Sequence, residues 1–123
     1  MHVFIIEDEY LISRSLQDML ERLGFDRFSF ARSEDAAVMG AAEQSIDLIT
    51  ADVRLLPGDG LRAVSEICRK RHIPVIFITA YAEELQDRAP EAIIVQKPVK
   101  AEALTEAVAL AMKPSASSEK SAD

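Results

Sequence analysis

Short runs of apolar residues alternate along the chain with longer stretches in which apolar residues recur every three or four positions. The short runs are typical of buried strands, and the longer stretches are typical of amphipathic helices. The clearest short runs are residues 3–6, 48–51, 73–78 and 93–95. This alternation favours a parallel sheet whose strands are joined by crossover helices. We therefore expect an α/β domain.

The expected helices carry recognisable end signals. Gly24 follows the first amphipathic stretch and is expected to end that helix. Ser33 is placed to cap the second helix. A third helix is expected to follow Gly60, with Cys68 in the core. The apolar positions of the first helix are Leu11, Ile12, Leu16, Met19, Leu20 and Leu23, and those of the last helix are Leu104, Ala107, Val108 and Ala111.

Two weaker segments complete the pattern. Phe28 and Phe30 alternate with polar residues, as in a strand at the edge of a sheet. Residues 82–89 leave room for little more than two helical turns before Pro90. The sheet is therefore expected to have five strands, and the fourth of its helices is expected to be short.

Length and charge limit the classes of protein to which the chain could belong. With 123 residues it is long enough for one domain with a hydrophobic core. Its 14 Lys and Arg residues against 21 Asp and Glu residues give a net charge of -7, and no segment concentrates the basic residues. Direct binding to nucleic acid is therefore disfavoured.

The sequence also bears on compartment and on the extent of the domain. A lone cysteine cannot form an internal disulfide, and the first residues lack the pattern of a signal peptide. No apolar stretch approaches the ~18 residues of a membrane span. We therefore expect a cytoplasmic protein that does not enter the membrane. Residues 113–123 are polar and are predicted to form a disordered tail, which leaves residues 1–112 as the folded domain.

Residues with complementary chemistry follow the expected strands. Glu7 and Asp8 follow the first strand, Asp52 the third, Thr79 the fourth and Lys97 the fifth. Ligands bind at the carboxyl ends of the strands in an open parallel sheet, so these side chains are expected at one edge. Each has a simpler explanation on its own: Asp8 could cap the next helix, and Lys97 could be solvated. Their combination at four strand ends favours a functional site.

A cluster of carboxylates at this edge would need a positive partner. At ~5 Å and an effective dielectric constant of ~20, two carboxylates repel each other by roughly 3 kcal/mol. Mg²⁺ suits such a cluster because it prefers oxygen ligands and often shares its coordination sphere with a phosphate. Asp52 could then attack a phosphoryl group whose charge Lys97 and Thr79 would stabilise.

In this order, the acidic pair after the first strand, Asp52, Thr79 and Lys97-Pro98 resemble the receiver domain of bacterial two-component response regulators, the CheY-like family. The similarity covers residues 1 to about 112. It implies a flavodoxin-like (βα)5 fold, a doubly wound parallel sheet with strand order 2-1-3-4-5. It also implies Mg²⁺-dependent phosphorylation of Asp52 by a histidine kinase or a phosphotransfer protein. A receiver acts as an enzyme only on itself, in gaining and losing this phosphoryl group.

The resemblance further implies how the metal would be held. Asp8 would ligate Mg²⁺ directly and Glu7 through a water molecule. Asp52 and the backbone carbonyl of Arg54 would supply further ligands. All of these groups offer oxygen to the ion, as Mg²⁺ requires.

The other residues of the edge would act on the phosphoryl group. By the same resemblance, Lys97 would contact its oxygens, and Thr79 would move toward them and so report phosphorylation. The small Ala80 would leave the path of attack open. Arg54 and Tyr81 stand at the positions that tune phosphoryl lifetime, and two bulky side chains there are expected to hinder the hydrolytic water.

The sequence departs from the family pattern on the side of the fourth and fifth strands. The family usually has Tyr or Phe where Ile94 stands, so the usual aromatic switch is expected to be absent, with Tyr81 as a candidate replacement. Residues 77–81, FITAY, partly resemble a subgroup of single-domain receivers with the motif Phe-Ala-Thr-Gly-Tyr, and depart from it at Ile78 and Ala80. Together with the short fourth helix, these departures predict an unusual partner surface.

We expect a receiver without an output domain, so signalling is expected through binding to a downstream protein. Two alternatives remain: a receiver-like module that binds its partner without phosphorylation, and a sink that drains phosphoryl groups from a relay. An aspartate-nucleophile phosphatase is disfavoured because Arg54 stands where it needs an acid or base. A flavin-binding relative would need a phosphate loop after the first strand. A phosphotransfer module is disfavoured because His2 and His72 lie at strand starts, where we expect them to be solvated.

Overall fold

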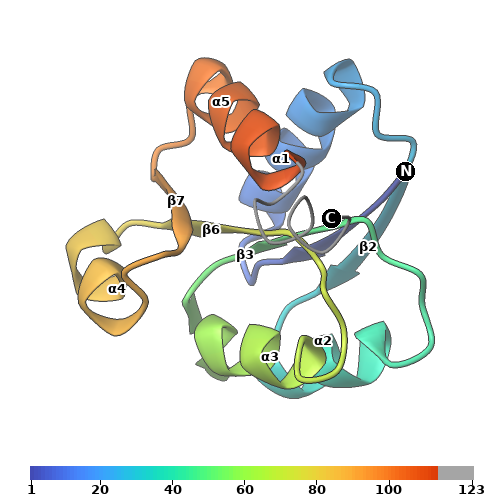
Figure 1. Ribbon diagram of the computed structural model, residues 1–123, viewed down its shortest axis with the longest axis vertical. Helices are drawn as coiled ribbons and strands as arrows, with labels where there is room; N and C mark the ends of the chain where they lie inside the picture. Colours follow the sequence, from blue (N-terminus) through green and yellow to red (C-terminus); the bar gives the residue numbers. More distant parts are fainter. Residues whose placement is uncertain (114–123) are drawn as a thin grey trace, which may run out of the picture.

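A five-stranded parallel sheet forms the middle layer of the computed structural model, which describes residues 1–113 (Figure 1). The strands lie in the order β2-β1-β3-β6-β7, and every neighbouring pair is parallel. Since β6 and β7 are the fourth and fifth predicted strands, the predicted order 2-1-3-4-5 and the flavodoxin-like fold are confirmed. The strands are β1 (His2–Ile6), β2 (Arg27–Ala31), β3 (Leu48–Ala51), β6 (Val75–Thr79) and β7 (Ile93–Gln96).

Helices cover both faces of the sheet. In Figure 1, α1 and α5 lie on one face, α2 and α3 lie on the opposite face, and α4 lies beside β7 at the edge of the sheet. Two hydrophobic clusters, one on each face, fill the space between the layers. The helices are α1 (Tyr10–Arg22), α2 (Glu34–Ala41), α3 (Gly60–Ile67), α4 (Ala82–Arg88) and α5 (Ala101–Ala111). The prediction of a short fourth helix is therefore confirmed.

Local sequence signals account for most of the helix boundaries. α1 ends at Arg22, and Gly24 then adopts a positive φ of 102°, which a residue without a side chain does at little cost. The Ser33 side chain accepts a hydrogen bond from the Ala36 amide at 3.2 Å, as expected of a cap. Asp59 caps α3 in the same way, accepting from the Leu61 and Arg62 amides at 2.8 and 3.2 Å.

A short antiparallel hairpin, which the sequence did not predict, follows β3. It pairs β4 (Arg54–Leu55) with β5 (Gly58–Asp59) and leads directly into α3. Gly60, the first residue of α3, packs against the backbone of Asp52. A Cβ atom at this position would lie 1.7 Å from the Asp52 carbonyl oxygen. Glycine is therefore required here for the hairpin to fold back against the end of β3.

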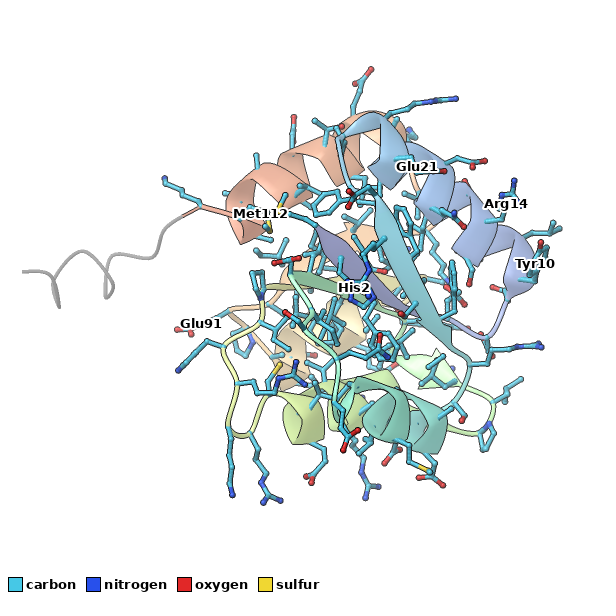
Figure 2. The ribbon with its side chains drawn as sticks, turned by 90° about the vertical axis from the view of Figure 1, so that its right-hand side faces the viewer. His2, Tyr10, Arg14, Glu21, Glu91 and Met112 are labelled. Atoms are coloured by element: carbon cyan, nitrogen blue, oxygen red, sulfur yellow. The ribbon has the colours of Figure 1, made fainter. Side chains whose placement is uncertain are left out.

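Two predictions about individual residues are wrong. Leu11 was expected on the buried stripe of α1 but is 79% exposed, because a helix that begins at Tyr10 turns Ser13, Leu16 and Leu20 inward instead. His2 was expected to be solvated but is buried beside the edge strand β2 (Figure 2). Its ring nitrogens form hydrogen bonds with the Ser45 carbonyl at 2.7 Å and the Ser29 hydroxyl at 2.8 Å.

The remaining predictions at this level have simple outcomes. His72 is exposed, as expected, and Cys68 is half-buried against the α2–α3 side of the core. No helix within residues 1–113 is both long and apolar enough to cross a bilayer. The predicted tail, apart from Lys113, lies outside the described residues.

Candidate functional site

Three carboxylates meet at the carboxyl ends of β1 and β3. The parallel register pairs Ile6 with Ala51, so the residues that follow these two strands emerge side by side. The Asp52 amide donates to the Ile6 carbonyl at 2.9 Å, which fixes this register one residue further. As a result, one carboxylate oxygen from each of Glu7, Asp8 and Asp52 lies within 4.8 Å of the others.

Lys97 inserts its ammonium group among these acids. Its Nζ lies 2.8 Å from Oδ2 of Asp52, 2.9 Å from Oε1 of Glu7 and 3.5 Å from Oε2 of Glu9. The Lys97 amide donates to the Thr79 carbonyl at 2.8 Å, so the β6–β7 pairing positions the side chain. With 13% of its side chain exposed, Lys97 is a largely desolvated cation rather than the solvated residue of the simpler interpretation.

The cluster contains more negatively charged groups than positively charged ones. Burial raises the pKa of Glu7 to about 7; the charge of Asp52 adds to this effect, whereas the nearby Lys97 ammonium opposes it. Burial alone would lower the pKa of Lys97, but Asp52 and Glu7 raise it above its usual range. Lys97 is therefore firmly charged, and one ammonium does not satisfy all of the acids around it.

The donor set fits a hard divalent cation. Oε1 of Glu7 is buried and, although Lys97 Nζ lies 2.9 Å away, it has no hydrogen-bond donor of good geometry among the described residues. Leaving such an oxygen unsatisfied is costly. Three converging carboxylates with a free buried lone pair match the oxygen ligands that Mg²⁺ prefers. Asp8 is free for this role, because α1 is capped at Glu9 without any side-chain hydrogen bond.

Thr79 ends β6 and Ala80 follows it; β6 lies between β3, which leads to Asp52, and β7, which leads to Lys97. The Thr79 side chain is fully buried, and its hydroxyl accepts a hydrogen bond from the Tyr81 amide at 2.9 Å. Ala80 is exposed, and its carbonyl accepts from the Gln96 side chain at 2.9 Å. Ile94 lies half-buried in β7 and packs against the core on the α2–α3 side.

The side chains of Arg54 and Tyr81 contact each other, and the sequence could not specify this contact. The guanidinium carbon of Arg54 lies 3.7 Å from the centroid of the Tyr81 ring. The same guanidinium donates to Oε2 of Glu84 in α4 at 2.8 Å. Glu84 was missed because it is one of several exposed acids in a short helix, and only the path of the unpredicted hairpin brings Arg54 to it.

This fold and this arrangement of acids, lysine and threonine define a class. The chain belongs to the response regulator receiver domain family, whose model matches residues 3–109. The predicted family resemblance is therefore confirmed. The assignment to the subgroup with the Phe-Ala-Thr-Gly-Tyr motif stays a prediction.

Two of the curated relatives are regulators that extend beyond the matched region. The chain is 42% identical over 100 residues to the phyllosphere-induced regulator PhyR of Methylorubrum extorquens, a match that covers 78% of this chain and 38% of the relative. It is 37% identical over 91 residues to the transcriptional regulatory protein PdtaR of Mycobacterium tuberculosis, covering 73% and 44%. The match thus spans less than half the length of each relative.

Solved structures share the whole architecture. The PhyR receiver domain of Erythrobacter litoralis superposes with a TM-score of 0.84 at 35% identity, covering 94% of this chain and 95% of that one. The anti-anti-sigma factor PhyR of Bartonella quintana gives 0.84 at 34% identity, covering 99% and 51%. The receiver domain of a Pseudomonas aeruginosa sensor histidine kinase, solved with magnesium in its active-site cleft, gives 0.78 at 26% identity, covering 90% and 96%.

Proposed function

We propose that this receiver accepts a phosphoryl group on Asp52 in a Mg²⁺-dependent reaction and signals by binding another protein. The observation that supports this most strongly is the position of Lys97, whose Nζ lies 2.8 Å from Asp52 inside a cluster of three carboxylates. A largely buried ammonium at this distance from one carboxylate suits the stabilisation of negative charge that builds up beside Asp52.

In the proposed reaction, a carboxylate oxygen of Asp52 attacks phosphorus. The bond from phosphorus to the donor's imidazole nitrogen breaks, and its electron pair leaves with the imidazole. Lys97 binds the phosphoryl oxygens as their charge grows, and the Thr79 hydroxyl gives up its bond with the Tyr81 amide to donate to them. Ala80 leaves room for the incoming group.

The metal site is part of the proposal. Asp8 and Asp52 would bind Mg²⁺ directly, Glu7 would act through water, and the Arg54 carbonyl would complete the protein ligands. Bound there, Mg²⁺ would neutralise the carboxylates and the phosphoryl oxygens that share its coordination sphere. Glu7 would supply a third carboxylate beside the ion, in a buried position.

The proposed partners are proteins. The phosphodonor would be a histidine kinase or a histidine phosphotransfer protein in the cytoplasm. A relative is described as an anti-anti-sigma factor, which suggests that the downstream partner is a regulatory protein such as an anti-sigma factor. Residues 1–112 would form the unit that is phosphorylated.

Intact-mass measurement after incubation with a small phosphodonor and Mg²⁺ tests this proposal. The parent chain should gain the mass of one phosphoryl group, and Asp52→Asn should gain none. Asp35→Asn is the matched control, because Asp35 is an exposed acid of α2 outside the cluster, and it should behave like the parent. Failure of the parent to gain mass would favour the alternative of a module that binds its partner without phosphorylation.

A further inference from the structure

Arg54 connects the loop after Asp52 to the neighbouring helix α4. Its guanidinium lies against the Tyr81 ring, with its carbon 3.7 Å from the ring centroid, and donates to Glu84 at 2.8 Å. Both side chains of the ion pair are about half exposed, at 57% and 48%. An ion pair in this setting contributes little stability and exchanges partners readily.

A second ion pair joins the same two segments. Nη2 of Arg88, at the end of α4, lies 2.8 Å from Oδ2 of Asp59 in the hairpin. Burial alone would raise the pKa of Asp59, but hydrogen bonds from Arg88 and from the Arg62 and Leu61 amides lower it. Asp59 therefore stays charged while it both caps α3 and binds α4.

Helix α4 has little else to hold it in place. It is seven residues long, and Leu85 is its buried residue. It lies at the edge of the sheet beside β7, away from the helices on either face (Figure 1). A helix with so few buried contacts opens locally at low cost, so surface ion pairs weigh more in its position than they would elsewhere.

Arg54 also lies within the electrostatic influence of Asp52. The hydrogen bond that Arg54 donates to Glu84 raises the pKa of Arg54, and the negative charges of Glu84 and Asp52 act in the same direction. Phosphorylation would replace the single charge of Asp52 with about two negative charges and three strong acceptor oxygens. A guanidinium binds such a group in two-pronged fashion more strongly than it binds a solvated carboxylate.

We infer that the Arg54 guanidinium exchanges partners. It is bound to Glu84 in the unphosphorylated protein, and it binds the phosphoryl group once Asp52 is modified. Glu84 is then a positioning residue, and the loss of its partner loosens α4 from the hairpin. This inference rests on the proposed phosphorylation of Asp52. The exchange of partners by Arg54 would carry the signal from Asp52 to α4, in a domain that has Ile94 where the family usually has an aromatic residue.

Hydrogen exchange of the α4 amides, with and without phosphorylation, tests the inference. In the unphosphorylated state, Glu84→Gln should exchange faster than the parent by about two- to fivefold, the range set by loss of one exposed ion pair. Phosphorylation should raise the exchange rate of the α4 amides in the parent to that of Glu84→Gln, and it should leave the rate in Glu84→Gln unchanged. Glu83→Gln is the matched control, since Glu83 is an exposed acid of α4 that forms none of the ion pairs found in residues 1–113, and it should follow the parent.

Variants of the arginine separate exchange of charge from simple packing. Arg54→Met keeps an apolar stem against Tyr81, and should abolish the response of α4 to phosphorylation. Arg54→Lys keeps the positive charge, and should retain part of the response. An unchanged α4 in the phosphorylated parent, or a full response in Arg54→Met, would overturn the inference. Intact mass, measured on every sample, separates these results from a failure of phosphorylation, which would reject the proposed function and this inference together.

Discussion

Glu7 is the residue at which burial and charge conflict most strongly. It is 2% exposed, follows β1 directly, and has one oxygen without a well-oriented donor. Lys97 relieves part of this conflict but shares its charge with Asp52 and Glu9. The sequence predicted that these side chains would meet, because strand ends in a parallel sheet share an edge. It could not predict how deeply Glu7 would be buried, which depends on how the chain packs over it.

The raised pKa of Glu7 leads to a prediction about stability without divalent cations. Its folded pKa of about 7 lies above the ordinary value of 4.5, so the folded state binds an extra proton between these pH values. The free energy of unfolding should therefore fall as the pH rises from about 4.5 to 7, by at most about 3 kcal/mol. Lys97 stays charged throughout this range.

Chemical denaturation at several pH values in the presence of a chelator measures this slope. Between pH 4.5 and 7, the free energy of unfolding of Glu7→Gln should change much less than that of the parent. Equal slopes for the two proteins would show that Glu7 titrates normally in the folded state.

Arg54 and Tyr81 should prolong the life of the phosphoryl group. The two large side chains contact each other at 3.7 Å, and the family resemblance predicts that side chains at these positions hinder the hydrolytic water. We expect Arg54→Ala and Tyr81→Ala each to lose the phosphoryl group several-fold faster than the parent. Following the intact mass after removal of the phosphodonor gives the rate, and a lifetime unchanged in both variants would contradict this role.

At the scale of elements, the hairpin β4–β5 determines which side chains lie around the site. Helix signals at Gly24, Ser33 and Pro90 were readable because each acts through its own backbone or its nearest neighbours. The hairpin was not readable, because two-residue strands carry no periodic pattern. Yet the hairpin places Arg54 near Tyr81 and Asp59 at the start of α3. The short helix α4 was predicted, but its ties to the hairpin were not.

Gly60 provides a test of this framing. A Cβ atom there would lie 1.7 Å from the Asp52 carbonyl oxygen, so Gly60→Ala should force the hairpin and the end of β3 apart. We expect a loss of about 3 kcal/mol in the free energy of unfolding or more, together with slower phosphorylation.

Gly40→Ala is the matched control for this substitution. Gly40 lies within α2, and its added methyl group would meet the edge of the Phe4 ring at 3.3 Å, a side chain that can shift slightly. Replacing a helical glycine by alanine generally stabilises by roughly 0.5–1 kcal/mol, so this variant should be close to neutral or better. Similar losses for both glycines would contradict a special role for position 60.

At the scale of the whole molecule, the fold gathers groups that are far apart in the sequence. β1, β3, β6 and β7 each deliver one part of the site, and the parallel register alone brings Asp52 beside Glu7 and Asp8. The site-bearing edge was therefore predictable from pattern, whereas the order of the strands was predicted from the family resemblance. The burial of His2 was not, because it depends on hydrogen bonds to Ser29 and Ser45 from two other segments.

The crowding of acids should be visible in the stability of the whole domain. Without divalent cations, Asp52→Asn should be more stable than the parent by about 1 kcal/mol, because it removes one of three mutually repelling carboxylates while Lys97 keeps Glu7 as a partner. Adding Mg²⁺ should raise the melting temperature of the parent more than that of the variant. A parent that melts higher than Asp52→Asn in chelator would contradict the repulsion.

The dependence of the initial phosphorylation rate on Mg²⁺ concentration, in the parent and in Asp8→Asn, tests most directly whether the acidic edge makes Asp52 a phosphoacceptor. In the parent the rate should rise with Mg²⁺ and saturate, and in Asp8→Asn it should need a much higher concentration to reach half of its maximum. A rate that is independent of Mg²⁺, or one that Asp8→Asn leaves unchanged, would contradict the account.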